Sequence, residues 1–543
     1  MRLSRWFGPP IAGLAAVALA ACGSTGSKVV VTNASGGLTI NTAPASKPVA
    51  QVTWGLYRDL QTVDPIFGFD YPENTVDAAL CDSLFRQLPD GSRQAGLATS
   101  VSNPTPTTDV LKLRPGVKFW DGHTMTSADV VYSLQRAANP KVGGFYTSIF
   151  SRVKSITASG PDQVTITLTK PDYWLLGELS SLPGVVIEKA FAQKAGSKYG
   201  TIAVGGMCTG PYKIQSWTNG GGLVAVPNPN YWDATVKPKA QKIIFKGYST
   251  TAVETGLITG AIGISYLTDP TILSRLKSAK NLTVTRGPSY ITDALIVSNL
   301  KGTLGDIRVR QALSMAIDRK SYIDAAFKGD AQLPNALANP GTWGYAKSVF
   351  QAAWNALPDY AKPDIAGAKK LIKQAGATGK SIEIGFSNEI PQLQIEAAAV
   401  EQAAKAIGLN VTLKPFSAAE WINVFTDPKV RAGLDGFFVN SYPDYGAPEA
   451  QYQQFVLPSG SLNYSGWQNA QVSQLLDESR GTADETKRAQ LVVQAQKIVM
   501  QQLPWIPMSA PNTDMITQSN LTGAPASFSY MYAPWAAAQI GAR

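Results

Sequence analysis

Alternating hydrophobic and polar positions predict that the first third of the chain is rich in β-strands. Residues 52–57, 109–114 and 163–168 each alternate with a period of two, which is typical of strands with one buried face. Between the last two, Thr126 and Asp129 are spaced as a capping box that opens a helix over 129–137. We therefore expect strands with few helices in this part.

From residue 364 the pattern changes to a regular alternation of helix and strand. The spacing predicts helices over 366–375, 393–407 and 418–425, and strands over 381–386, 410–416 and 434–439. A further helix after Asp306 has its apolar residues one turn apart. Strand–helix–strand order predicts a parallel sheet with right-handed crossovers.

Polar and aromatic residues follow the last of these strands. Ser441, Tyr442, Asp444 and Tyr445 come directly after the strand predicted to end at residue 439. Ligands of open α/β sheets bind just beyond the carboxyl ends of the strands. This segment is therefore our first candidate for a ligand-binding site.

The N-terminus has the features of a secretory signal peptide over residues 1–21. Arg2 and Arg5 precede an apolar run over 11–21, which is too short to span a membrane. The run leads directly into Cys22, and this pattern resembles the lipobox of bacterial lipoproteins, which implies lipidation of Cys22. An ordinary secretory signal with a nearby cysteine is the alternative.

Residues 22–50 are rich in small and polar residues, and we expect them to form a flexible tether. The predicted location is the outer face of the cell membrane, with the protein held there by a lipid anchor. The remaining body is long for one domain, so two or more lobes are expected. The net charge of +10 is spread along the chain without basic clusters, which argues against a nucleic-acid partner.

Two cysteines remain once Cys22 is assigned to lipidation. Cys81 and Cys208 form an even pair in an oxidising compartment, which favours a disulfide between them. Two buried free thiols are the alternative.

Catalytic patterns are sparse. The single histidine, His123, lies in a turn-like stretch and has no nucleophile elbow to serve. One histidine and two distant cysteines match no zinc spacing. The segment from Gly379 to Ser381 resembles the end of a phosphate-binding loop, but Gln374 stands where the first glycine of that motif should be. We therefore predict a binding protein that is not an enzyme and has no cofactor or metal.

Several segments, taken together and in order, resemble the extracellular solute-binding proteins of peptide and nickel ABC importers. The segments are 111–122, 126–134, the T-G-P-Y strand at 209–214, the N-P-N-Y-W turn at 228–232, and the V-R-Q-A-L helix at 306–319. The resemblance implies an α/β fold with two lobes that close like a clamshell, the first lobe being discontinuous. We place lobe one at 51–265 with a subdomain near 90–195, lobe two at 266–504, and a return to lobe one over 505–543.

The resemblance also implies a function. In peptide-binding members an Asp in an A-D-Y-x-x-P segment pairs with the ligand's α-amino group, and Asp444 occupies that position. Asp444, Tyr445, Ser441, Tyr442 and Tyr57 are the expected ligand-binding residues. Ala447 departs from the family pattern because many relatives carry a second Asp there.

We expect a monomer that captures oligopeptides for an ABC permease. The same fold binding an oligosaccharide, an opine or a metal chelate is the main alternative. A lipoprotein that regulates the envelope without transport is another. The sequence leaves the ligand and the permease open.

Overall fold

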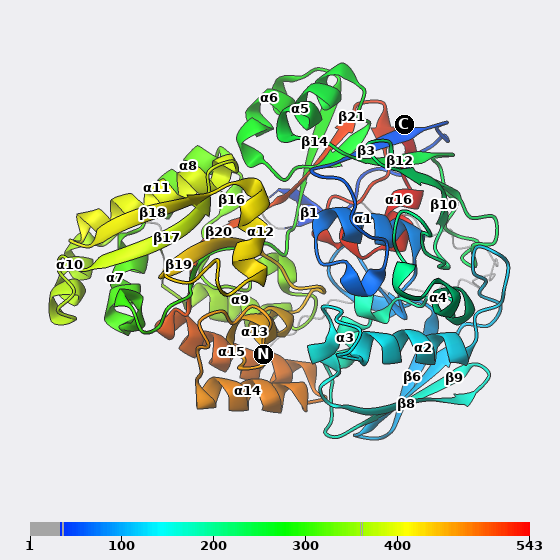
Figure 1. Ribbon diagram of the computed structural model, residues 1–543, viewed down its shortest axis with the longest axis horizontal. Coiled ribbons are helices and arrows are strands. Elements are labelled where there is room, and N and C mark those ends of the chain that lie inside the picture. The colour runs from blue at the N-terminus through cyan, green and yellow to red at the C-terminus, as the bar shows by residue number, and fades with distance from the viewer. Residues whose placement is uncertain (1–32, 35–36, 359, 361) are drawn as a thin grey trace, which may run out of the picture. The chain divides into compact units, whose positions relative to one another are not determined.

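Two large mixed β-sheets organise the chain (Figure 1). The computed structural model describes residues 33–34, 37–358, 360 and 362–543. The predicted signal peptide, Cys22 and the first part of the tether lie outside the described residues. Among the residues described, no helix has both the length and the apolar composition needed to cross a bilayer.

The first sheet has seven strands and is built around β3. In spatial order the strands are β10 (Tyr212–Thr218), β11 (Gly222–Pro227), β12 (Ile243–Gly247), β3 (Val52–Leu56), β13 (Ile264–Tyr266), β21 (Thr513–Gln518) and β14 (Leu282–Gly287). Strand β3 is parallel to both of its neighbours, and the other pairs are antiparallel. The alternating pattern at residues 52–57 therefore forms the middle of this sheet.

The second sheet contains the parallel strands expected from the helix–strand alternation. Its order is β16 (Ala331–Gln332), β20 (Trp505–Pro511), β15 (Thr292–Val297), β19 (Gly436–Ser441), β17 (Ser381–Ser387) and β18 (Asn410–Phe416). Strand β17 is parallel to both β18 and β19, whereas β15 is antiparallel to β19 and β20. The parallel part of the prediction is confirmed.

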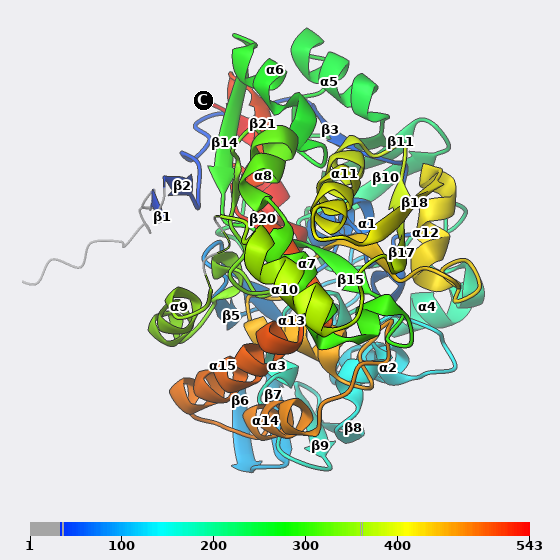
Figure 2. The same ribbon diagram turned by 90° about the vertical axis from the view of Figure 1, so that its left-hand side faces the viewer.

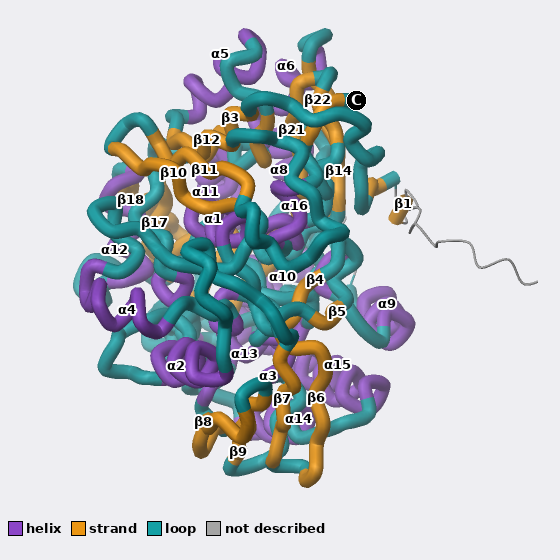
Figure 3. The backbone as a smooth tube through the Cα atoms, turned by 90° about the vertical axis from the view of Figure 1, so that its right-hand side faces the viewer, coloured by secondary structure: helices purple, strands orange, loops and turns teal. Residues whose placement is uncertain are grey.

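A smaller antiparallel sheet is formed by the part of the chain between β3 and β10 of the first sheet. It consists of β6 (Ala98–Thr105), β7 (Thr108–Leu113), β9 (Gln163–Leu168) and β8 (Val153–Gly160), with α2 (Ser127–Ala138) packed beside it (Figure 3). Helix α2 begins with the predicted capping box, in which the Asp129 carboxylate accepts from the Thr126 backbone N–H at 2.9 Å. Short antiparallel pairs complete the strands: β4 (Phe85–Gln87) with β5 (Arg93–Ala95), β22 (Leu521–Thr522) with β23 (Gly541–Ala542), and β1 (Asn33–Ala34) with β2 (Leu38–Thr39).

Helices cover both large sheets. The helices near the first sheet are α1 (Tyr71–Leu80), α5 (Thr250–Thr259), α6 (Leu273–Ser278) and α16 (Pro534–Ala538), while α3 (Leu175–Glu178) and α4 (Lys189–Ala195) follow the small sheet. Those associated with the second sheet are α7 (Ile307–Ala316), α8 (Arg319–Phe327), α9 (Lys347–Asn355), α10 (Ile365–Gln374), α11 (Pro391–Ala406), α12 (Ala418–Thr426), α13 (Pro448–Val456), α14 (Ala470–Arg480) and α15 (Glu485–Gln502). Figure 1 shows α11 running along the yellow strands β17 and β18, with α10 at their left-hand end.

The chain passes between the two sheets twice. The first passage lies between β14, which ends at Gly287, and β15, which begins at Thr292. The second is Asn512 alone, between β20 and β21. We expected these changes near residues 265 and 504, so the strands place both of them later in the chain. The two largest hydrophobic cores, one at each sheet, change over at the same two places, except that Trp174 also packs in the second core.

The buried carboxylate of Asp330 holds the two passages together. It pairs with Arg286 at the end of β14 and with Lys277, whose Nζ lies 3.2 Å away. Its other oxygen accepts from the side-chain amide of Asn512 at 2.9 Å. The two passages are therefore neighbours in space, although more than 200 residues separate them in sequence.

Figure 2 shows α14 beside the small sheet, and ion pairs join this helix to residues that flank the strands of that sheet. Arg480 forms a two-pronged pair with the buried Asp172, with N–O distances of 2.8 and 2.6 Å. Arg152 and Lys170 both pair with Asp477. The residues following the small sheet thus contact a helix of the second core.

The segment before β3 is held more firmly than we expected. Residues up to 50 were predicted to form a tether, but the Thr42 hydroxyl donates to Ala524 O at 2.6 Å. The backbone N–H of Ser46 donates to Ala542 O, and that of Val49 donates to Lys239 O, both at 3.0 Å. These bonds occur because the polar backbone here meets unpaired groups beside the C-terminal residues.

Cys81 and Cys208 form a disulfide, as predicted. Cys81 is the C-cap residue of α1, and Cys208 lies just before β10. Their Cα atoms are 5.0 Å apart and both residues are buried. The bond therefore ties the end of α1 to the strand that forms the edge of the first sheet.

Replacing both cysteines by serine should lower the free energy of unfolding. The bond closes a loop with a sequence separation of 127 residues, for which chain entropy gives about 4–5 kcal/mol. Urea unfolding of the parent and of Cys81→Ser/Cys208→Ser measures the difference. A reductant should weaken the parent and leave the double variant unchanged; an equal effect on both would contradict this assignment.

Candidate functional site

Asp444 lies where the second sheet meets residues of the first core. Strand β19 ends at Ser441, and the loop 442–447 leads into α13. The Asp444 Oδ1 atom accepts from the Tyr532 hydroxyl at 2.8 Å, and its backbone oxygen accepts from Gln87 Nε2 at 2.6 Å. Gln87 belongs to β4 and Tyr532 to the C-terminal region. The loop is therefore held by groups from outside its own sheet.

Close backbone contacts explain why Gly446 in this loop and Gly344, which meets it, are both glycines. The Gly446 carbonyl accepts from the Gly344 N–H at 2.9 Å. A Cβ at Gly344 would collide with backbone oxygens of both Gly446 and Gly91. Three chain segments therefore meet here at backbone distance, which positions Asp444 against the β4–β5 turn.

Aromatic rings line one side of this region. The Tyr442 ring lies 5.3 Å from that of Tyr71 and 4.9 Å from that of Phe528, and its hydroxyl donates to Phe69 O at 3.1 Å. The Tyr57 ring contacts the same Tyr71 ring, edge to face, at 6.3 Å. Thus the structure brings Tyr57 and Tyr442 together through Tyr71.

Tyr57 is also part of a charged group at the end of β3. Its hydroxyl donates to the Asp70 carboxylate, and Arg58 pairs with Asp70 and Glu73 at 2.7 and 2.6 Å. Burial, followed by the charge of Asp70, raises the pKa of Tyr57 far above its usual value. The hydroxyl therefore stays protonated and donates its one hydrogen to Asp70, while the side chain remains exposed.

The other two predicted residues are placed differently. Ser441 is buried inside β19, opposite Thr292 of β15, because the strand extends two residues beyond the predicted end. Tyr445 is buried in a small apolar cluster with Ala447 and Ala450. Its ring packs so closely on Gly177 that a Cβ there would collide with it. Both residues shape the loop in this structure.

The carboxyl groups around Asp444 have no cationic partner among the described residues. Burial raises the pKa of Asp444 to about 6, although the hydrogen bond from Tyr532 lowers it. Burial, reinforced by the charge of Asp444, raises the pKa of Glu178 well above its usual value. Glu178 accepts one hydrogen bond, from Gln453 Nε2 at 3.3 Å. At neutral pH the region thus offers the Asp444 carboxylate and nearby tyrosine hydroxyls to a ligand and is suited to a cationic group.

Sequence reasoning missed the residues that contact Asp444 from elsewhere in the chain. Gln87 and Tyr532 lie 357 and 88 residues away from it. The aromatic run from Phe528 to Tyr532 was the one local signal that could have identified part of this set.

Asp444 does not line either of two hollows found on the protein surface. One of about 340 Å³ is lined by Arg152, Lys170 and Asp477, and another of about 240 Å³ lies beside Pro288 and Pro511. Asp444 itself is partly buried beneath the side chains that contact it. A ligand reaching its carboxylate would have to replace some of those contacts.

Comparison with known proteins identifies relatives over most of the chain. The family model described as bacterial extracellular solute-binding proteins, family 5, matches residues 93–463. The glutathione-binding protein GsiB of Escherichia coli strain K12 is 24% identical over 476 residues, which cover 85% of this chain and 89% of GsiB.

Solved structures agree with the predicted fold class. AgaA of A. tumefaciens R10, in complex with agropinic acid, aligns with a TM-score of 0.79 and 21% identity, over 91% of this chain and 99% of AgaA. DppA of Helicobacter pylori, in complex with the peptide STSA, aligns with a TM-score of 0.78 and 19% identity, over 91% and 98% of the two chains. The two-lobed α/β fold is therefore confirmed.

Asp444→Asn should stabilise the protein at neutral and alkaline pH. The raised pKa means that the folded state binds the Asp444 proton more tightly than the unfolded state does. Stability from this group is therefore lost as the pH rises from about 4 to about 6, a loss of at most about 3 kcal/mol. Asparagine keeps the acceptor for Tyr532 and cannot ionise. Urea unfolding of both proteins at pH 4 and pH 8 should show a gain for the variant at pH 8 only. If the variant and the parent were equally stable at pH 8 as well as at pH 4, this would contradict the burial of this carboxylate.

Proposed function

Because the chain belongs to family 5 of the bacterial extracellular solute-binding proteins, we propose that it captures short peptides by their α-ammonium group for an ABC importer. The observation that carries this proposal is Asp444, a partly buried carboxylate that no cation of the described residues pairs with. An ammonium enclosed with it would gain a charge-assisted hydrogen bond in place of its water.

The surroundings of Asp444 support an enclosed ligand. Gln87 and Tyr532 are the groups that a ligand would displace or share, since both now bond to Asp444. Tyr57, Tyr71 and Tyr442 form an aromatic wall beside them. Such a wall offers apolar contact to peptide side chains without demanding one sequence.

The relatives support the same ligand class. GsiB is named for glutathione, and the DppA structure contains a peptide. AgaA contains agropinic acid, which makes an organic acid the competing ligand. The Asp444 carboxylate, which is ionised at neutral pH, favours the cationic end of a peptide over an anion.

We further propose the remaining features of the sequence-based prediction. The protein acts by binding alone, Cys22 carries its lipid anchor, and closure moves the two sheets as lobes about the passages at 288–291 and 512. Ser441 and Tyr445 then support the loop, while Asp444, Tyr442 and Tyr57 face the ligand.

Asp444→Asn should remove most of the affinity for peptides. Loss of one buried charge partner costs about 2–5 kcal/mol, which is about thirtyfold to several-thousandfold in Kd. Calorimetry with a set of di- to pentapeptides measures this, and N-acetylated peptides should bind the parent comparably weakly. The two losses should not add, because each removes the same interaction.

Asp427→Asn is a matched control, because Asp427 lies on the surface and caps a backbone N–H with an oxygen that asparagine retains. Its peptide affinity should equal that of the parent. If Asp444→Asn binds free and acetylated peptides as tightly as the parent, the ammonium role of Asp444 is wrong. If agropinic acid binds and peptides do not, the ligand class is wrong.

Peptide affinity should also fall on acidification. Burial holds the pKa of Asp444 at about 6, and an ammonium pairs with its ionised form. Below that pH the carboxyl must first release its proton, so affinity should weaken by up to about tenfold per pH unit. Calorimetry at pH 5 and pH 7.5 in buffers of different ionisation enthalpy would detect both the loss and the released proton. Asp444→Asn should lack this pH dependence, and an equal dependence in both proteins would assign it to another group.

A further inference from the structure

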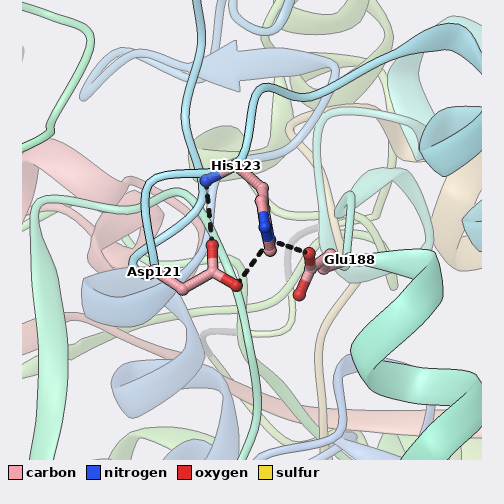
Figure 4. Close-up of side chains that lie close together, drawn as sticks. All are labelled: Asp121, His123 and Glu188. Atoms are coloured by element: carbon pink, nitrogen blue, oxygen red, sulfur yellow. Dashed lines mark hydrogen bonds and ion pairs between the residues drawn. The ribbon is translucent and has the colours of Figure 1, made fainter.

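The single histidine of the chain faces two carboxylates in a turn remote in sequence from the Asp444 loop (Figure 4). Asp121 and His123 lie in the turn between β7 and α2, and Glu188 is the residue just before α4. The fold brings these two segments together across 65 residues of sequence.

One ring nitrogen serves both acidic groups. His123 Nδ1 lies 2.8 Å from Asp121 Oδ2 and 2.9 Å from Glu188 Oε1. A nitrogen with one hydrogen can direct it at only one of the two oxygens. A metal ion bound to all three atoms would satisfy both carboxylates at once. The three atoms lie within 4.8 Å of one another, so small side-chain shifts would bring them to the spacing of about 3.4 Å that ligands have around a tetrahedral zinc ion.

The Asp121 carboxylate and the turn that carries His123 are held in place before any ion binds. The other oxygen of Asp121 accepts from the His123 backbone N–H at 3.0 Å, which fixes the carboxylate within the turn. The turn itself is closed by a hydrogen bond from Phe119 N–H to His123 O at 2.9 Å, and Gly122 supplies the positive φ of 96° that it needs. Little rearrangement would therefore accompany binding.

Glu188 provides a separate indication of a cation. Its side chain is only 8% exposed, whereas that of His123 is 74% exposed. Within the described part of the chain, this imidazole is the only side chain that hydrogen-bonds or pairs with the Glu188 carboxylate. A buried carboxylate with so little compensation is suited to a metal ion, and the exposed imidazole leaves water access to the remaining coordination positions.

We propose that Asp121, His123 and Glu188 form a binding site for a divalent first-row metal ion such as Zn²⁺. One imidazole nitrogen and two carboxylate oxygens suit zinc and its neighbours, whereas Mg²⁺ and Ca²⁺ prefer oxygen ligands alone. Bound metal would link the turn to the start of α4. The site is independent of peptide capture at Asp444.

The single histidine makes a direct test possible. ZnCl₂ is titrated into the full mature chain, purified without a histidine tag and stripped with a chelator, and is followed by calorimetry. A long-range ¹H–¹⁵N spectrum, which contains one imidazole, reports the ring nitrogen that coordinates. We expect one saturable site, a shift at Nδ1, and a higher unfolding temperature with zinc.

His123→Ala and Asp121→Asn should each weaken zinc binding at least about tenfold, as should Glu188→Gln. Asp324→Asn is the control, because Asp324 pairs with a lysine on the surface and its removal should leave zinc affinity unchanged. Three results would overturn the site: no saturable binding, parental affinity in His123→Ala, or coordination through Nε2 with Glu188→Gln unaffected.

Discussion

The two passages of the chain between the sheets set the geometry on which the other features depend. Strands β20 and β21 belong to different sheets, yet Asn512 alone separates them. The other passage lies beside it, and the buried Asp330 carboxylate binds both Asn512 and Arg286, which is the last residue but one of β14 before the other passage. The proposed closure therefore needs backbone changes at only a few residues, which is the arrangement of a hinge.

The Asp444 loop is connected to this joint by a short chain of hydrogen bonds. Gln87 donates to the Asp444 carbonyl and accepts from the Tyr290 hydroxyl at 3.2 Å. Tyr290 lies within the first passage, between β14 and β15. A ligand that displaces Gln87 would therefore alter a contact of the hinge itself. Binding and closure share groups at this point, so each would influence the other.

The sequence predicted those parts of the structure that depend on local pattern. The alternation over 364–439 predicted parallel strands, and the Thr126–Asp129 spacing predicted the start of α2, because hydrophobic period and capping chemistry act over a few residues. The end of β19 was predicted two residues early, because Ser441 pairs with Thr292, a partner that no local pattern reveals. Gln87 and Tyr532 at Asp444, like Glu188 at His123, come from distant segments. Their placement follows from the packing of whole sheets.

The position of β20 and β21 has a consequence for the order of folding. Each is an internal strand of its sheet, with β20 between β16 and β15, and β21 between β13 and β14. Both come after residue 504, so neither large sheet can close its hydrogen-bond ladder until this late segment has been made. Before then β13, β14 and β15 each present an unpaired edge, which is a template for wrong pairing. Such a chain gains from remaining unfolded until it has crossed the membrane, and a late, sequence-distant pairing step should set its folding rate.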